Sequence, residues 1–337
     1  MRTVVIGAGR MGRRHIQVVK SLGLELVGIC DPSSESLALA ETEQSVAAEL
    51  HFKDATLMLA ATSPEIVVVA STAPTHCEYT CAAAEAGAKV VLCEKPMGVS
   101  LAECDRMIET CRAHGTRLAI NHQMRYMEQY TAAKEIVDSD AFGGLGSVTV
   151  VAGNFGMSMN GTHYFEMFRY MTGEAPVEVQ AWFSPDLLSN PRGPQFSDRA
   201  GSIRVTTASG KRFYMEIGPD QGHGMHVTYA GPNGRLDVDE LAGKMAWVVR
   251  EEQYRELPTT RYGMPNIQSE RAIAPADAVT PTRHVLEAVI KGEDWPTGED
   301  GRRAVAVLVA AYQSDENGHV PVRIDDKLAR SRVFPWA

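Results

Sequence analysis

Residues 3–12 read TVVIGAGRMG, a β-prone run that ends in three glycines with the spacing G-x-G-x-x-G. Residues 10–22 predict a helix, so the glycines stand between a strand and a helix. Gly7 allows the tight turn, Gly9 lets a pyrophosphate approach the backbone, and Gly12 lets the helix pack closely on the strand. The free N–H groups at the start of the helix then face the phosphates. The alternative interpretation is a turn between strand and helix that merely needs glycine. The dinucleotide contacts that we predict here are Gly7, Gly9, Arg10, Met11 and Gly12.

Short apolar strands alternate with helices as far as residue 121. The expected strands are 3–6, 25–30, a short one near 51, 65–71, 89–93 and 117–121. The expected helices are 10–22, 34–42, 54–61, 76–86 and 100–114. Strands that are apolar on both faces and separated by helices indicate a parallel sheet covered on both sides. We therefore predict an α/β protein whose residues 1–122 form a doubly wound, dinucleotide-binding Rossmann domain.

After residue 122 the pattern changes to longer strands with few helices between them. The expected strands are 147–155, 177–184, 201–208, 211–217, 225–231, 235–238 and 319–324. The expected helices are 128–139, 163–172, 281–291 and 301–316. Strands grouped in this way favour a large open, mostly antiparallel sheet with helices on one face. We expect a substrate-binding and oligomerising domain over 123–337, with helix 301–316 packing back toward the first domain and a long functional loop at 184–199.

Asp31 follows the second expected strand, where a carboxylate accepts hydrogen bonds from the hydroxyls of the adenosine ribose. An NADP site instead needs a cation at this place. Between Pro32 and Phe52 the chain has four Glu and no Lys or Arg. We therefore predict NAD rather than NADP, with Arg10 as the cation able to turn toward a 2′-phosphate.

The strand 89–93 is followed directly by Glu94, Lys95 and Pro96. A surface turn is the simplest reading of this sequence. In a doubly wound sheet, however, ligands bind outside the carboxyl ends of the strands, which places these residues beside the nicotinamide. The Lys95 ammonium then hydrogen-bonds a substrate oxygen and stabilises developing negative charge, while Glu94 holds the lysine in place.

The order of these motifs resembles the Gfo/Idh/MocA family of oxidoreductases. The matching motifs are GAGRMG (7–12), Asp31, SxxPTH (71–76), CEKP (93–96), GTHYFE (161–166) and the segment 299–322. The resemblance covers nearly the whole chain and implies hydride transfer between NAD(P) and a sugar, polyol or sugar derivative. It also implies that Lys95 contacts cofactor and substrate, that His163 is the general acid/base, and that the second domain's sheet forms homodimers or homotetramers.

Further contacts follow from the same resemblance and from the strand ends. The predicted cofactor contacts are Ser71, Thr72, His76, Glu94, Lys95 and Asn121. A capping or packing role is as well supported for His76. The predicted substrate contacts are Arg125, Asn160 and Glu166. For Arg125, a salt bridge in the linker between the domains is an equally good reading.

One position departs from the family pattern. Many sugar dehydrogenases of the family have an Asp four residues before the catalytic His, where this chain has Met159. Methionine cannot accept a hydroxyl hydrogen bond. Either Asn160 substitutes as a neutral partner, or the substrate differs, or oxidation chemistry is lost. Two alternatives to a dehydrogenase therefore remain open: an enzyme that retains NAD and uses transient internal redox, and a non-catalytic NAD-binding sensor.

Composition bounds the remaining possibilities. The chain has 337 residues and a net charge of −9, without a long basic run, which argues against nucleic-acid and anionic-membrane surfaces. No apolar run is long enough to span a bilayer. The six cysteines lie on apolar segments, so we expect core thiols rather than disulfides or a metal site, and a cytoplasmic location.

Overall fold

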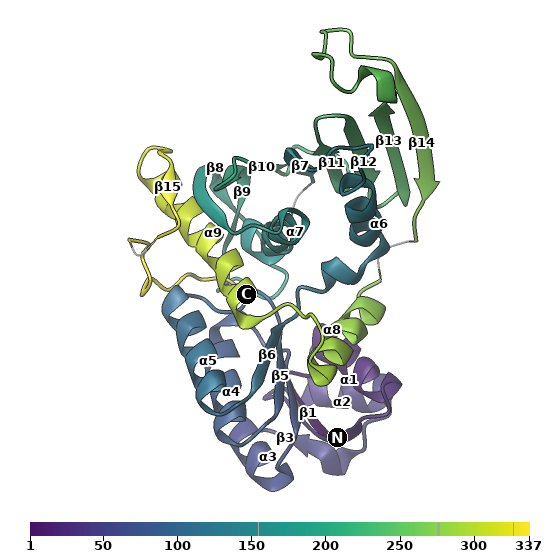
Figure 1. Ribbon diagram of the computed structural model, residues 1–337. Helices are drawn as coiled ribbons and strands as arrows, with labels where there is room; N and C mark the ends of the chain where they lie inside the picture. The colour runs from purple at the N-terminus through teal and green to yellow at the C-terminus, as the bar shows by residue number, and fades with distance from the viewer. Residues whose placement is uncertain (154, 275–276, 326) are drawn as a thin grey trace.

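The computed structural model describes residues 1–153, 155–274, 277–325 and 327–337 (Figure 1). Six parallel strands form the first sheet in the order β3-β2-β1-β4-β5-β6. They are β1 (Arg2–Ile6), β2 (Glu25–Cys30), β3 (His51–Phe52), β4 (Ile66–Val69), β5 (Val90–Cys93) and β6 (Arg117–Ile120). The intervening helices are α1 (Arg10–Ser21), α2 (Ser34–Gln44), η1 (Ala48–Leu50), α3 (Ala55–Thr62), α4 (Ala73–Glu85) and α5 (Leu101–Ala113). The winding direction reverses between β1 and β4, so a ligand crevice is expected outside the carboxyl ends of these strands.

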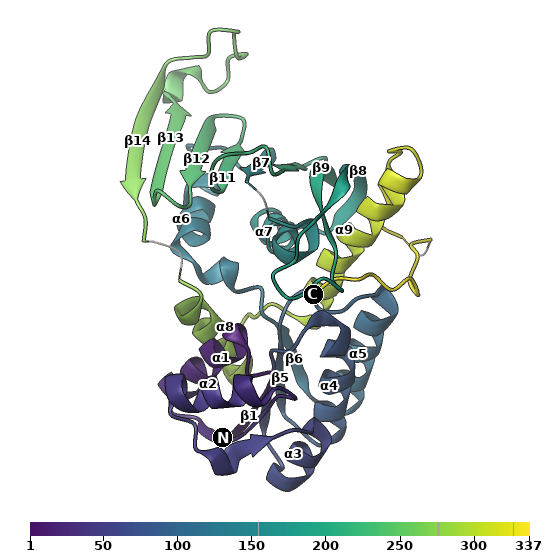
Figure 2. The same ribbon diagram turned by 180° about the vertical axis from the view of Figure 1, so that it is seen from behind.

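The sequence of β4 shows why both faces of this sheet are covered. Ile66 and Val68 pack into one apolar layer, Val67 and Val69 into the other, and all four side chains are fully buried. Because side chains alternate along a strand, an all-apolar strand requires helices on both faces. Helices α3, α4 and α5 supply one layer, while α1 and α2 supply the other (Figures 1 and 2). The predicted doubly wound parallel sheet is confirmed.

A helix from the far end of the chain completes the second layer. Helix α8 (Val279–Lys291) packs Val285, Leu286 and Val289 into the same apolar cluster as α1. The N–H of Ile120 in β6 donates to Pro296 O at 2.9 Å, so the segment after α8 also joins the sheet edge. Residues from the second half of the chain therefore help to build the first domain.

Nine strands form the second sheet, in the order β14-β13-β12-β11-β7-β10-β9-β8-β15. They are β7 (Ser147–Ala152), β8 (Pro176–Leu188), β9 (Asp198–Thr207), β10 (Arg212–Ile217), β11 (His226–Ala230), β12 (Gly234–Asp239), β13 (Lys244–Arg250), β14 (Asn266–Ala272) and β15 (Val322–Arg323). Only β7 and β10 pair in parallel among these neighbours, so the sheet is mixed and mostly antiparallel, as predicted. The accompanying helices are η2 (Gln123–Tyr126), α6 (Glu128–Val137), η3 (Met157–Gly161), α7 (Thr162–Thr172), η4 (Glu252–Tyr254) and α9 (Gly298–Glu316).

Two details of this sheet differ from the sequence-based expectation, and part of one expected strand lies outside the described residues. Strand β8 continues to Leu188 and β9 starts at Asp198, so the expected loop 184–199 is a connection of residues 189–197. Strands β13 and β14 were not predicted; they form a hairpin that extends beyond the rest of the molecule in Figure 1. The exposed side chains of β14 conceal its alternation from the sequence. Residue 154 of the expected strand 147–155 lies outside the described residues.

The last residues fold back onto the chain itself. Phe334 and Trp336 stack with ring centroids 4.5 Å apart, and both contact Tyr312 of α9. The N–H of Phe334 donates to Val99 O in the first domain, at 2.9 Å. Helix α9 itself packs against α5 and β6, so it contacts the first domain as expected.

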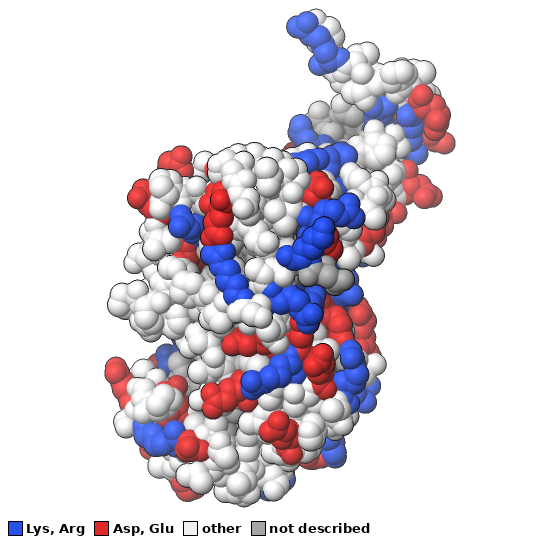
Figure 3. Space-filling model, turned by 90° about the vertical axis from the view of Figure 1, so that its left-hand side faces the viewer, with Lys and Arg blue, Asp and Glu red and all other residues white. Residues whose placement is uncertain are grey.

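The six cysteines are free and buried, and all of them pack in the apolar cluster that contains α4 and α5, as core thiols do. On the face shown in Figure 3, cationic and anionic side chains lie next to one another. Among the described residues, no helix is both long and apolar enough to cross a membrane.

Candidate active site

The glycine turn after β1 is shaped by its contacts. Gly7 has φ +96°, and a Cβ there would lie 2.6 Å from the backbone of Ala70 at the end of β4. A Cβ on Gly12 would lie 1.8 Å from Gly7 O, so α1 packs on the turn only because Gly12 has no side chain. Gly9 faces open space instead, with no atom within 4 Å of an added Cβ. The turn therefore has the close packing and the open cradle that a pyrophosphate requires.

Asp31 lies at the end of β2 and is tied to this turn. Its carboxylate accepts hydrogen bonds from the N–H groups of Ala8 and Ser33, both at 2.8 Å. Lys53, one residue beyond the segment that lacks cations, reaches back and donates to Pro32 O at 3.0 Å and to Ser34 Oγ at 2.8 Å. Sequence analysis missed this lysine because β3 and β2 are neighbours only in the folded sheet.

A cavity of about 740 Å³ lies outside the carboxyl ends of β1, β2 and β4. Its lining includes most of the predicted cofactor residues: Gly7, Gly9, Arg10, Met11, Asp31, Ser71, Thr72 and Glu94. It also includes Lys53, Tyr79, Met159 and Arg192. The size and the glycine cradle fit a dinucleotide, whose nicotinamide supplies hydride transfer when it is bound.

Glu94 lines the cavity and forms hydrogen bonds with side chains from two other segments of the first domain. It is 4% exposed, and its carboxylate bonds His15 Nε2 at 2.7 Å and Asn121 Nδ2 at 2.8 Å. Burial alone would raise the pKa of Glu94, but the hydrogen bonds and charges of His15, Lys95 and Asn121 hold it well below its ordinary value. Asn121 thus donates a hydrogen bond to Glu94. His15 in α1 bonds the same carboxylate, and the sequence pattern did not predict it.

His76 supports the turn from behind. It is 1% exposed, and its ring nitrogens lie 2.9 Å from Pro96 O and 3.1 Å from Ser71 O. Burial lowers its pKa, despite both carbonyl contacts. The Lys95–Pro96 peptide bond between these elements is cis. His76 therefore joins the segment after β4 to the Glu-Lys-Pro turn, which is the packing role left open from the sequence.

Lys95 crosses the crevice to the second domain. Its Nζ donates to Met159 O at 2.5 Å, in the π-helix η3 that precedes α7. Burial, with help from Arg192 and Arg10, lowers the pKa of Lys95 to about 8, against the opposing charges of Glu94 and Asp198. Among the described residues Met159 O is the hydrogen-bond acceptor of this ammonium, which has three donors, so further donors remain for a substrate oxygen.

His163 stands one turn after Met159, at the start of α7. It is 8% exposed, and its Nδ1 has no hydrogen-bond partner among the described residues. Burial, with the charge of Lys95, lowers the pKa of His163 well below its ordinary value. Its ring meets that of His122 edge to face, with centroids 5.7 Å apart. The imidazole is therefore neutral near pH 7, and the charge of Lys95 opposes its protonation.

Two of the predicted substrate residues are paired with each other. Arg125 Nη2 lies 2.5 Å from Glu166 Oε1, and both side chains are almost fully buried. Glu166 also accepts from Arg169 at 2.7 Å, and Arg125 reaches Asp300 at 3.6 Å. This arrangement is the linker salt bridge that the sequence also allowed. Asn160, half-buried in η3, follows the carbonyl that Lys95 binds.

Comparison with known proteins agrees with this geometry. Residues 1–122 match the family described as "Oxidoreductase family, NAD-binding Rossmann fold", and residues 153–324 match its "C-terminal alpha/beta domain". An inositol 2-dehydrogenase from Pseudomonas savastanoi pv. phaseolicola is 31% identical over 344 residues, covering 95% of this chain and 96% of the relative. The chain belongs to this family of oxidoreductases, the Gfo/Idh/MocA family.

Solved structures show the same fold at lower identity. An oxidoreductase from Agrobacterium radiobacter in complex with NAD⁺, L-tartaric acid and magnesium has a TM-score of 0.79 at 17% identity, covering 96% of this chain and 98% of that one. Myo-inositol 2-dehydrogenase from Lactobacillus plantarum has a TM-score of 0.73 at 21% identity, covering 96% and 99%. The family match and the inositol 2-dehydrogenase relative, not these structures, show that the chain is an NAD(P)-dependent oxidoreductase with an NAD-binding Rossmann domain.

Proposed function

We propose that this protein interconverts a hydroxyl and a carbonyl group on a sugar, polyol or nucleotide-sugar derivative, with NAD as the hydride carrier. The observation that carries the proposal is the contact between Lys95 Nζ and Met159 O at 2.5 Å. This contact brings the Lys95 turn to the helix start that bears His163. The curated relative that acts on inositol supports a polyhydroxylated substrate.

In the proposed reaction Lys95 hydrogen-bonds the reacting oxygen and stabilises negative charge as the proton leaves. His163 accepts the hydroxyl proton during oxidation and returns it during reduction. The lowered pKa of His163 keeps its imidazole neutral near pH 7, so it is ready to act as a base. The pKa of Lys95 at about 8 keeps most of the ammonium charged at that pH. We therefore expect turnover to decline above about pH 8, where Lys95 loses its proton.

We propose NAD over NADP because Asp31 occupies the end of β2 beside the cavity. A 2′-phosphate there would meet this carboxylate. Lys53 and Arg10 line the same cavity and partly offset that repulsion. Titration of NADH and NADPH fluorescence against the protein at physiological salt measures the preference, and tighter binding of NADPH would contradict it.

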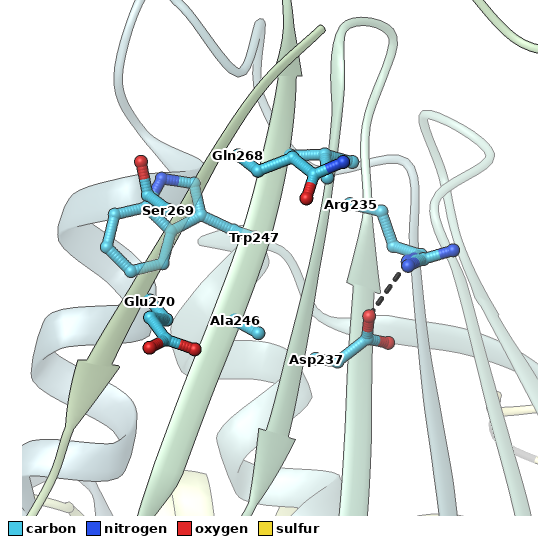
Figure 4. Close-up of a pocket in the computed structure, with 8 residues that line it drawn as sticks. Arg235, Asp237, Ala246, Trp247, Gln268, Ser269 and Glu270 are labelled. Atoms are coloured by element: carbon cyan, nitrogen blue, oxygen red, sulfur yellow. Dashed lines mark hydrogen bonds and ion pairs between the residues drawn. The ribbon is translucent and has the colours of Figure 1, made fainter.

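We also propose that the second sheet forms homo-oligomers. Helices α6, α7 and α9 cover one face of this sheet, and the other face carries a hollow of about 400 Å³ over β12, β13 and β14. Figure 4 shows Gln268 and Glu270 beside this hollow, with Arg235 paired to Asp237 nearby. Analytical ultracentrifugation tests this assembly, and a monomer at micromolar concentration would contradict it.

The free cysteines favour a reducing compartment, and we propose that the protein is located in the cytoplasm.

The function is tested by incubating the protein with NAD⁺ and a panel of polyols, aldoses, sugar acids and nucleotide sugars while NADH absorbance is recorded. We expect NADH with one of these classes. In the reverse direction the matching keto compounds should consume NADH. Binding of NAD with no turnover in either direction would contradict a dehydrogenase and favour internal redox or a sensor.

A further inference from the structure

Asp198 is a buried carboxylate that the sequence reasoning did not single out. It stands at the start of β9 and is 1% exposed. Its oxygens accept hydrogen bonds from the N–H groups of Ser158, Met159 and Arg199, each at 2.9 Å. Two of these donors belong to the π-helix η3, forty residues earlier in the chain. A carboxylate from β9 of the second sheet therefore fixes the helix that faces the cofactor cavity.

The approach of Asp198 to this helix depends on a glycine. A Cβ on Gly156 would lie 1.8 Å from Asp198 Oδ2, so any other residue would displace the carboxylate. Gly156 is the residue immediately before η3. Because residue 156 is a glycine, the Asp198 carboxylate can approach the N–H groups of Ser158 and Met159 near the start of the helix.

The same residue, Met159, connects Asp198 with Lys95. Its N–H donates to Asp198 at 2.9 Å, while its carbonyl accepts from Lys95 Nζ at 2.5 Å. Met159 thus contributes through its backbone, although its side chain has no polar atom that can accept a strong hydrogen bond. The charged and titratable groups that act on Lys95 or His163 here are Glu94, Asp198, Arg10, Arg192 and His122. Asp198 and Glu94 are the two anions among them, one from each side of the crevice.

We propose that Asp198, at the start of β9, is a positioning residue that supplies the carboxylate that position 159 in η3 lacks. It holds the Met159 carbonyl in the place where the Lys95 ammonium binds, and its negative charge stabilises that ammonium. The part of this proposal that concerns turnover rests on the proposed function. The part that concerns the protonation of Lys95 does not.

The first test therefore titrates Lys95 without any substrate. The protein is labelled with acetic anhydride at graded pH, and the peptide that contains Lys95 is quantified by mass spectrometry. Asp198→Asn removes the negative charge at nearly constant volume. We expect its Lys95 to react with a midpoint at lower pH than wild type, by about half a unit or more. Asp198→Ser, which is smaller and also neutral, should give the same shift and serves if the asparagine variant does not fold.

Asp239→Asn is the matched control. Asp239 lies in the same domain, accepts the N–H of Ala242 at 2.9 Å and pairs with His226, and within the described residues it has no hydrogen bond to η3. This variant should leave the Lys95 midpoint unchanged. A midpoint that stays at the wild-type value in both Asp198 variants would overturn the proposal, whether or not the enzyme's substrate is known.

With a substrate in hand, Asp198→Asn should lower kcat by roughly ten- to a hundredfold and move the alkaline limb of kcat to lower pH. The affinity for NADH should change less than about threefold, because Asp198 does not line the cofactor cavity. Adding Met159→Asp to Asp198→Asn should recover part of the lost turnover and return the alkaline limb toward wild type. An unmoved limb, with turnover lost only in proportion to the unfolded fraction, would assign Asp198 a purely structural role.

Discussion

The two sides of the active-site crevice are built in different ways. On the first-domain side, Glu94 and Lys95 follow β5 directly, and the parallel sheet carries them to the crevice. On the second-domain side, Met159 and His163 belong to a helix start that is fixed by Asp198, 39 residues beyond Met159. The first side depends on strand ends that are visible in the sequence. The second depends on a contact that exists only after the mixed sheet has formed, so substitutions should affect the two sides differently.

The largest expected effect comes from removing the proposed catalytic residue on either side. Lys95→Ala and His163→Ala should each lower turnover by ~10²–10⁴ while the protein remains folded. The exposed Lys89 and His114 supply controls of the same residue types, and Lys89→Ala and His114→Ala should leave turnover unchanged. The measurement is NADH formation with the substrate class that the panel identifies. Wild-type turnover in either crevice variant would remove that residue from the mechanism.

The second effect tests whether Glu166 binds substrate or holds the second-domain side together. Glu166→Gln breaks a buried ion pair and leaves the Arg125 charge partly uncompensated, which should cost about 3–5 kcal/mol of unfolding free energy. Glu299→Gln breaks the exposed pair with Arg112 and should cost less than about 1 kcal/mol. Urea unfolding measures both. If the Glu166 variant keeps its stability but raises KM, the residue belongs to the substrate site instead.

The first domain could be read from the sequence because its determinants are local. An all-apolar strand such as Ile66–Val69 has one stable environment, a sheet covered on both faces, and G-x-G-x-x-G between a strand and a helix specifies the turn. The hairpin of β13 and β14 could not be read in this way. Residues 266–272 are largely exposed on both faces, so they lack the alternation that marks a half-buried strand.

The candidate site could be predicted only in part, for the same physical reason. Lys95 and Glu94 were predicted from their place after a strand, and His163 was predicted by resemblance; their roles stay predictions. His15, Lys53 and Asp198 were missed because each reaches the site from an element that is distant in sequence. No motif spacing encodes such partners, and only the sheet order of the fold brings them together.

The third effect contrasts two buried carboxylates. Glu94 has cationic and amide partners and a lowered pKa, whereas Glu240 has the hydroxyls of Tyr130 and Tyr164, and burial raises its pKa to about 7. A pKa above the unfolded value means that Glu240 favours the folded state at low pH, and this contribution is lost as pH rises through about 7. The loss amounts to at most about 3 kcal/mol between pH 4.5 and 8.

Glu240→Gln should therefore become more stable relative to wild type as pH rises from 5 to 8, as measured by urea unfolding. Glu94→Gln should show no such change in this window. The lowered pKa of Glu94 places its titration in more acidic solution, where its contribution is lost as pH falls. A difference between wild type and the Glu240 variant that is constant with pH would show that Glu240 is ionised throughout.

The smallest effect concerns the adenosine end of the first-domain side. Lys53 is held on Pro32 O and Ser34 Oγ, beside the carboxylate of Asp31. Lys53→Ala should weaken NADPH binding by roughly three- to tenfold and NADH binding by less, because an exposed lysine contributes about 1 kcal/mol to a phosphate. Lys89→Ala, far from the cavity, should change neither affinity. Equal weakening of both cofactors would mean that Lys53 acts by holding the Pro32 turn rather than by meeting a phosphate, and the choice of NAD would then depend on Asp31 alone.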